Sequence, residues 1–232
     1  MSMLQDLKRL NFGMAFRTWQ QSRVNQNHLK TAREAFNAYN KRAQVKKIQF
    51  GSGANSLDGW LNTDANPKAN AVFVDIKKTL TFENESFDFA FSEHVFGYLN
   101  FKEAAQHLED VFRILKKGGV YHIETPNLDL IKKHPMAVKD YYNWYLEKFK
   151  VPNDGPETVY FLNHFFKIAY GTYFHNATSL KFLAQKNNWT SLKFFDTNQK
   201  SSFEALQNIS HHKDVIGANH NHLETIIVEL VK

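Results

Sequence analysis

The chain has 232 residues, of which 43% are hydrophobic and 15% aromatic, so it can bury one sizeable core without dividing into several. It contains no cysteine, which excludes disulfide bonds and thiolate metal sites and suits a reducing cytoplasm. The net charge is +6, but the lysines are scattered in pairs rather than gathered in a stripe, so the sequence carries no clear nucleic-acid signal.

Residues 1–44 predict two helices. Leucines recur at every third position between residues 4 and 10, and Ala32, Phe36 and Tyr39 lie on one face of the second helix. The first helix is a candidate for a membrane-surface anchor, but its polar face is weakly cationic, so we expect it to pack against the protein. No apolar run approaches ~18 residues, and the first ten residues lack a hydrophobic region, so neither a membrane span nor a signal peptide is expected.

The central stretch, residues 47–94, reads as four short buried strands, each followed by a polar loop. The predicted strands are residues 48–50, 60–63, 71–74 and 87–91. Gly51-Ser52-Gly53 follows the first strand, and Asp64 and Asp75 follow the second and third. In an open parallel sheet, ligands bind beyond the carboxyl ends of the strands. Glycines let the backbone approach such a ligand, and an acid accepts the two ribose hydroxyls, so this pattern predicts a nucleoside site.

The dinucleotide form of this pattern does not fit. Ser56 stands where a third glycine is expected, and Asp64 lies 13 residues after Gly51 (64 − 51) instead of about 20. The nine residues from Gly51 to Gly59 leave little room for the helix whose amino end would hold a pyrophosphate. A nucleoside cofactor without phosphate fits better.

A well-marked helix follows the fourth strand. Asn100 is a good N-cap, Glu103 completes a capping box, and the sequence at 116–119, Lys-Lys-Gly-Gly, is expected to end the helix. Residues 120–123 then form a fifth strand. This alternation of strands and helices is typical of a doubly wound α/β sheet.

The second half begins with an aromatic-rich helical insertion, which the Pro/Gly-containing stretch 151–156 divides. After it we expect a helix that Thr178 caps and that runs through Ala184, then a strand at 191–195. Residues 223–231 predict the last strand, which we expect to be antiparallel.

Three segments carry a resemblance to a known family: IQFGSGANSLDGWLNTDANP, FDFAFSEHVFGYL and ILKKGGVYHIETPNL. Together they resemble the class I S-adenosylmethionine-dependent methyltransferases, most closely a branch with a shortened first loop that is associated with cell-surface polysaccharide genes. The resemblance implies a Rossmann-like, mostly parallel seven-stranded sheet, S-adenosyl-L-methionine as cofactor, and a sugar or cell-envelope precursor as the small-molecule or glycan acceptor.

We expect a single methyltransferase-like domain over residues 1–232, in a cytoplasmic enzyme. Its parts are the N-terminal helices (1–44), the cofactor-binding half (45–127), the helical insertion or lid (128–178) and the C-terminal half (179–232). The residues expected to bind the cofactor are Gly51, Ser52, Gly53, Asn55, Asp64, Asp75, Ile76 and Ser92.

Methylation of a sugar hydroxyl requires a general base in addition to alignment of the acceptor with the methyl group. His94 follows the fourth strand directly. Many relatives carry a Glu-His pair a few residues later, where this chain has Gly97-Tyr98, so His94 and Tyr98 are both candidates. A half-buried structural role for His94 stays open.

Three further residues are candidates for the acceptor side. Glu124 follows the fifth strand, with a capping or salt-bridging role as the alternative. His164 and His175 resemble a later segment of the family, and that resemblance implies that they face the acceptor.

Two other functions remain open from the sequence. The departure at Gly97-Tyr98 is compatible with a catalytically degenerate cofactor-binding or scaffold protein, and an RNA methyltransferase is the alternative within enzymes. The histidine-rich segment at 211–222 does not show three convergent ligands, so we predict no metal site. The sequence does not indicate the oligomeric state.

Overall fold

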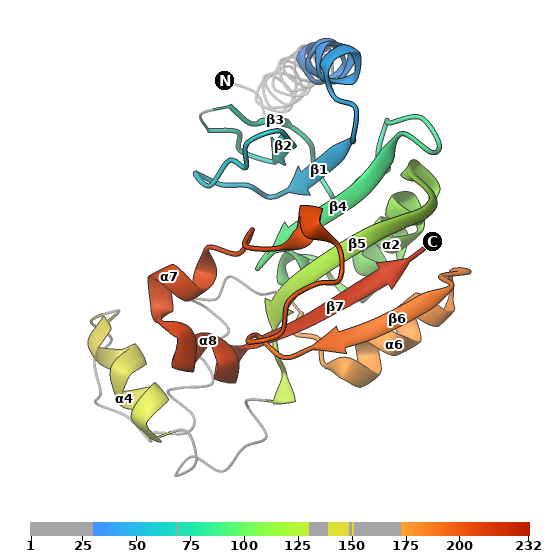
Figure 1. Ribbon diagram of the computed structural model, residues 1–232. Helices are drawn as coiled ribbons and strands as arrows, with labels where there is room; N and C mark the ends of the chain where they lie inside the picture. Colours follow the sequence, from blue (N-terminus) through green and yellow to red (C-terminus); the bar gives the residue numbers. More distant parts are fainter. Residues whose placement is uncertain (1–29, 69, 130–138, 149, 151–172) are drawn as a thin grey trace, which may run out of the picture.

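A computed structural model describes residues 30–68, 70–129, 139–148, 150 and 173–232. Its centre is a seven-stranded sheet in the order β3-β2-β1-β4-β5-β7-β6, in which only β7 runs antiparallel to its neighbours (Figure 1). The strands are β1 Lys47–Phe50, β2 Leu61–Asp64, β3 Val72–Phe73, β4 Phe87–Glu93, β5 Leu115–Pro126, β6 Ser191–Phe195 and β7 Thr225–Val231. The predicted Rossmann-like fold with an antiparallel last strand is confirmed.

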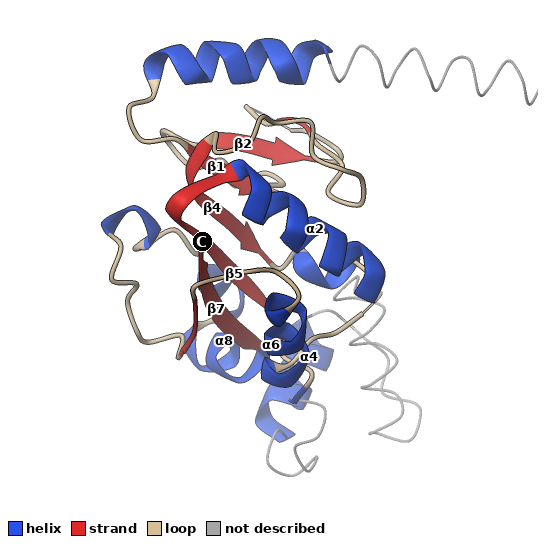
Figure 2. Ribbon diagram, turned by 90° about the vertical axis from the view of Figure 1, so that its right-hand side faces the viewer, coloured by secondary structure: helices blue, strands red, loops and turns tan. Residues whose placement is uncertain are grey.

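The helices occupy two places around this sheet. A helix over residues 30–42, α2 (Phe101–Ile114) and α6 (Ala177–Gln185) pack on one face, and Figure 2 shows α2 and α6 there. The helices α4 (Lys139–Lys148), α7 (His212–Ile216) and α8 (Ala218–Glu224) lie beyond the carboxyl ends of the parallel strands (Figure 1). Within the described ranges, no helix is both long and apolar enough to cross a membrane.

Two apolar cores lie on opposite faces of the sheet. Successive residues of a strand point to opposite faces, so Ala90 of β4 belongs to the core beneath α2, while Phe91 belongs to the other. That second core is covered by residues 196–211, which we call the covering segment. This segment contains the short helix η3 (Glu204–Leu206) and inserts Leu206 and Ile209 above Phe91. Figure 1 shows the covering segment passing in front of β5 and β4.

The covering segment is needed because the connection from β1 to β2 contains no helix. Its residues, 51–60, form only turns, with the Asn55 N–H donating to the Ser52 carbonyl and the Trp60 N–H donating to the Leu57 carbonyl. This face therefore receives its apolar cover from residues more than a hundred positions later in the chain.

The helix that follows β4 begins as predicted and ends earlier. The Asn100 side chain accepts from the N–H of Glu103, whose carboxylate accepts from the N–H of Asn100, so the capping box is present. The expected stop at 116–119 was wrong, because these residues form the start of β5. Sheet interactions hold them there: Gly118, at φ +79°, donates its N–H to the carbonyl of Lys232.

Two other boundaries differ from the prediction. The N-cap of α6 is Asn176, not Thr178, because the Asn176 side chain accepts from the N–H of Ser179 and the Ser179 hydroxyl completes a second capping box. Leu223 and Glu224 lie in α8, and β7 begins at Thr225. The predicted first helix and the stretch 151–156 lie outside the described residues.

Candidate functional site

The loop after β1 is shaped by two glycines in the left-handed region of φ. Gly51 has φ +64°, and a Cβ atom there would lie 2.2 Å from Cγ2 of Val95, so the loop after β4 packs directly on it. Gly53 has φ +55°, and a Cβ atom there would meet nothing within 4 Å. The glycine loop is therefore closed at Gly51 and open at Gly53, where its backbone is accessible to a ligand.

Asp64 ends β2 beside this loop, as predicted. Its Oδ2 accepts from the N–H of Gly53 (2.9 Å) and its Oδ1 accepts from the N–H of Asn66 (2.7 Å). A carboxylate offers about four acceptor positions, so each oxygen can still accept a ribose hydroxyl. Close by, the Ser52 hydroxyl is buried and has no hydrogen-bond partner among the described residues. An open glycine backbone, a carboxylate with spare acceptors and an unpaired hydroxyl fit a nucleoside cofactor.

The other predicted cofactor residues lie near the same edge of the sheet with different surroundings. Asp75 follows β3; its Oδ1 accepts from the N–H of Lys77, and its Oδ2 lies 3.4 Å from Nζ of Lys78. Ile76 is partly buried against the main core. Asn55 is exposed, and its carbonyl accepts from the side chain of Gln49 (3.1 Å).

Ser92, at the end of β4, points into the protein. It is 1% exposed, and its hydroxyl lies 2.9 Å from that of Tyr121, which in turn contacts Nε2 of His107. The side chain is thus engaged beneath α2 and does not face a ligand at the edge of the sheet.

A cavity of about 620 Å³ lies between the helix over residues 30–42 and the segment 73–83. Phe36, Asp75 and Lys78 are among its lining residues, whereas the glycine loop and Asp64 are not. We therefore do not assign the cofactor to this cavity.

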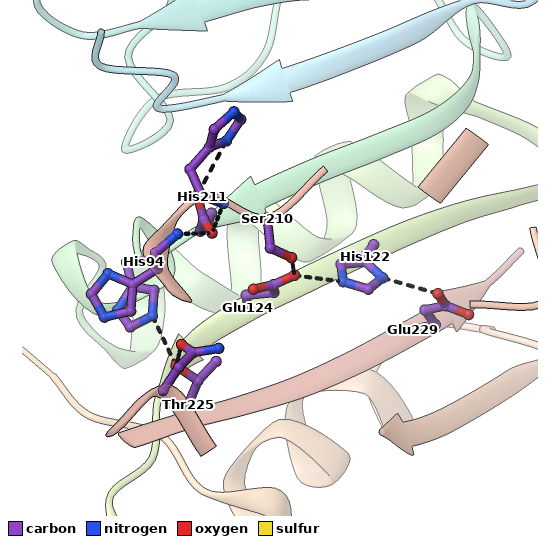
Figure 3. A network of polar contacts seen from close by, with 10 residues as sticks. His94, His122, Glu124, Ser210, His211, Thr225 and Glu229 are labelled. Carbon is purple, nitrogen blue, oxygen red and sulfur yellow. Dashed lines mark hydrogen bonds and ion pairs between the residues drawn. The ribbon is translucent and has the colours of Figure 1, made fainter. Parts of the chain in front are cut away.

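A buried ionic group joins β5 to β7 on the face beneath the covering segment. His122 lies 2.9 Å from Glu229 through Nδ1 and 3.1 Å from Glu124 through Nε2, and Ser210 donates a short hydrogen bond to Glu124 (Figure 3). Burial would lower the pKa of His122, but the two carboxylates outweigh it and raise this pKa to about 9. Burial likewise opposes ionisation of Glu124, yet the hydrogen bond from His122 keeps its pKa below the ordinary value. His122 is thus a buried cation held by two carboxylates.

His94 stands at the carboxyl end of β4 with its backbone at φ +50°, a conformation that residues other than glycine adopt mainly under constraint. Its N–H donates to the carbonyl of Glu124 (2.8 Å), and its Nε2 lies 3.0 Å from the Thr225 hydroxyl. That hydroxyl donates its own proton to Oδ1 of Asn221 (2.8 Å), so it accepts from Nε2 of His94. The proton of the neutral imidazole is therefore on Nε2, and Nδ1 carries a lone pair. Burial lowers the pKa of His94 to about 4, so the ring is neutral.

Two more glutamates hold α7 and α8 against this end of the sheet. Oε1 of Glu93 accepts from the backbone N–H groups of His211 and His212, both at 2.7 Å. Glu224, the last residue of α8, accepts from the Tyr141 hydroxyl of α4 (2.7 Å) through Oε2. Burial raises the pKa of Glu93.

The structure separates the residues predicted for catalysis. His94 and Glu124 lie in the polar network, whereas Tyr98 lies on the short helix η1 (Phe96–Tyr98) and is 38% exposed. His175 is completely buried, with its ring 5.0 Å from that of Phe96, and burial lowers its pKa to about 4. This position suits packing better than contact with an acceptor. His164 lies outside the described residues.

The sequence analysis assigned no role to several members of the network: His122, His212, Glu224 and Glu229. His122 and Glu229 left a signal, because each is an ionisable residue inside an otherwise apolar strand, a placement that requires a buried partner. His212 and Glu224 have no such signal in the sequence, because only folding brings α7 and α8 to the end of β4.

Residues 24–123 match the family model of a methyltransferase domain. The enzyme class predicted from the sequence, an S-adenosylmethionine-dependent methyltransferase, is thereby supported, and S-adenosylmethionine is its cofactor. The glycine loop and Asp64 are the residues of this chain that fit it.

Solved structures are similar to this methyltransferase in fold. One is an S-adenosylmethionine-dependent methyltransferase from Mesorhizobium loti, at 12% identity and a TM-score of 0.50, covering 82% of this chain and 92% of that chain. Another is a SAM-dependent methyltransferase from Archaeoglobus fulgidus, at 15% identity and a TM-score of 0.48, covering 88% of this chain and 93% of that chain. No curated protein sequence matches the chain significantly.

The glycine loop gives a first prediction. Gly53→Ala places a methyl group in the open space beside the loop, so S-adenosylhomocysteine should bind at least tenfold more weakly in calorimetry. Gly118→Ala is a matched control. Gly118 also has a positive φ (+79°) and open surroundings, but it lies near the start of β5, away from the carboxyl ends of the strands. Both variants should lose a similar ~1–2 kcal/mol of stability from backbone strain. Equal cofactor affinity in the two variants would place the cofactor elsewhere.

The charge on His122 gives a second prediction. Its pKa is raised from 6.5 to about 9, so its contribution to stability is complete below pH ~6.5 and disappears as the pH rises through ~9. That contribution is of the order of 3 kcal/mol. Urea unfolding of the wild type should therefore show stability falling between pH ~7 and ~10, and His122→Gln should abolish this fall. The exposed His222→Gln variant should keep the wild-type profile; an unchanged profile in His122→Gln would mean that His122 is neutral.

Proposed function

We propose that this protein methylates a hydroxyl group of a sugar or cell-envelope precursor in the cytoplasm, using S-adenosylmethionine. The observation that carries the proposal is the close packing of Val95 on Gly51, which supports a role for the neighbouring His94 beside the loop that we propose binds the cofactor. Cofactor and acceptor then meet between the carboxyl ends of β1 and β4. The absence of cysteine suits the proposed compartment.

S-Adenosylmethionine supplies an activated methyl group, so the protein has to position the acceptor and handle its proton. In this proposal, the backbone at Gly53 and the carboxylate of Asp64 hold the nucleoside. The imidazole of His94 presents an unprotonated Nδ1 at the acceptor side, because Thr225 fixes the proton on Nε2.

The charges of this region favour an uncharged acceptor group. Three buried carboxylates, Glu124, Glu224 and Glu229, and the partly buried Glu93 lie on β4, β5 and β7 or at the end of α8, and His122 is the buried histidine whose pKa is raised. Phosphates would be repelled, which disfavours an RNA substrate. Sugar hydroxyls can donate to such acceptors.

The alternative is a catalytically degenerate cofactor-binding or scaffold protein, since Gly97 and Tyr98 replace the Glu-His pair of many relatives. The two functions are distinguished by turnover. Mass spectrometry of envelope glycans from cells with and without the gene should reveal a species heavier by one methylene group only when the protein is present. Cofactor binding without any methylated product, in cells or with purified glycan precursors, would favour the scaffold function.

Asp64 gives a direct prediction for the cofactor. Asp64→Ala removes a charged acceptor from two ribose hydroxyls, and each such bond contributes about 1.5–3 kcal/mol, so affinity for S-adenosylhomocysteine should fall at least tenfold. The melting temperature should also fall modestly, because Gly53 and Asn66 lose their acceptor. Asp58→Ala, an exposed change in the same loop, should alter neither quantity. Full affinity in Asp64→Ala would contradict the assignment.

A further inference from the structure

We propose that His94, His212 and Glu224 form a binding site for one divalent transition-metal ion of the zinc type. The three residues come from the loop after β4, the start of α7 and the end of α8, and one ligand atom from each lies within 4.8 Å of the others. Two imidazoles and one carboxylate, with a fourth position open, form a donor set typical of catalytic zinc sites. Magnesium and calcium prefer oxygen ligands alone.

The separations between these atoms suit a shared ion. Oε1 of Glu224 lies 3.4 Å from Nε2 of His212 and 3.9 Å from Nδ1 of His94. Ligands at about 2.0–2.1 Å from a tetrahedral zinc ion lie about 3.3 Å from one another. The pair of His212 and Glu224 already has this spacing, and His94 would have to approach Glu224 by roughly half an ångström. The rings of His94 and His212, whose centroids lie 3.6 Å apart at an interplanar angle of 32°, would have to turn toward a common point.

Nδ1 of His94 faces the site with a lone pair and no proton. Thr225 fixes the proton of His94 on Nε2, so Nδ1 faces the Glu224 carboxylate as a second acceptor. Nε2 of His212 is buried and makes no hydrogen bond to any described residue. Two hydrogen-bond acceptors that face each other in a poorly hydrated place repel each other unless a cation or a proton lies between them.

Each of the three ligands is held from behind, as metal ligands usually are. Thr225 orients the ring of His94, and the Tyr141 hydroxyl holds the other oxygen of Glu224 at 2.7 Å. Glu93 fixes the start of α7 by accepting from the N–H of His212 itself. The ligand geometry is thus set by groups that do not face the site.

The charge balance also favours a cation. Among the described residues, no lysine or arginine forms an ion pair with Glu93, Glu124, Glu224 or Glu229. His122 compensates the pair of Glu124 and Glu229 in part, and Glu224 has only the neutral Tyr141 hydroxyl and the imidazoles. A divalent ion at Glu224 would offset this excess of buried negative charge.

The role of the ion rests on the proposed function. With the ion bound, Nδ1 of His94 would be one of its ligands and would no longer take the acceptor's proton. An acceptor hydroxyl bound at the open position would instead have a lower pKa and release its proton to solvent. Its oxygen lone pair then forms the bond to the methyl carbon while the carbon–sulfur bond breaks, and the sulfonium becomes a neutral thioether. This arrangement would activate a hydroxyl without the Glu-His pair that Gly97 and Tyr98 replace.

The test measures metal binding on the untagged full chain, without cofactor or acceptor. Calorimetry with Zn²⁺ should give one site per chain, and Co²⁺ should give the visible absorption of a tetrahedral site with nitrogen and oxygen ligands. His212→Ala should weaken Zn²⁺ binding by more than the 10–100-fold typical for loss of an outer partner. Glu224→Gln should act in the same direction. The matched control is His222→Ala, which removes a half-exposed histidine of the same segment that pairs with Asp196.

The outcomes separate this proposal from its alternatives. The proposal would be overturned if Zn²⁺ did not bind. It would also be overturned if His222→Ala abolished Zn²⁺ binding and His212→Ala did not. If Zn²⁺ does not bind, a proton takes the place of the ion between the side chains. The proposed function is tested independently by S-adenosylhomocysteine binding and by the glycan methyl shift. Metal binding with no cofactor affinity would therefore contradict the function and leave the metal site intact.

Discussion

The buried ionic contact of His122 with Glu124 and Glu229 is the interaction on which the functional end of the sheet depends. It crosses from β5 to the antiparallel β7, and through Ser210 it also attaches the covering segment to the same carboxylate. Burying charges costs several kcal/mol per ion, so such a group is stable only while every partner is present, and loss of one partner typically costs 3–5 kcal/mol. Three separate parts of the chain are thus fixed together by one imidazole.

The short connection between β1 and β2 explains why the covering segment is there. Without a helix in residues 51–60, the apolar face of Phe91 and Val120 has to be covered by something else. Residues 196–211 supply that cover and lead directly into α7. The same packing requirement that closes the core therefore delivers His211 and His212 to the carboxyl end of β4, where Glu93 accepts from their backbone.

The loop after β1 and the loop after β4 are joined through a single tight contact. Val95 packs on Gly51 so closely that only glycine fits, and His94, one residue earlier, is held at a positive φ. A strained residue of this kind persists only where its surroundings fix it, here through the Glu124 carbonyl and the Thr225 hydroxyl. In the proposed function, binding of a nucleoside at the glycine loop and positioning of an acceptor at His94 would share one rigid element.

The sequence by itself determined the positions of most strands along the chain, the glycine loop and the acid at the end of β2, because these features depend on local patterns: short apolar runs, glycines at a turn and a polar residue at each strand end. It also predicted the capping box of α2, which involves residues only three apart. Local signals misplaced the start of β5, since the Lys-Lys-Gly-Gly run is typical of a helix end and only pairing with the last residue of the chain makes it a strand. The cluster of polar side chains beyond the carboxyl end of β4 was decided by tertiary structure alone. His94, His212 and Glu224 are separated by up to 130 positions (224 − 94), and the packing of α7 and α8 on the sheet brings them within 4.8 Å of one another.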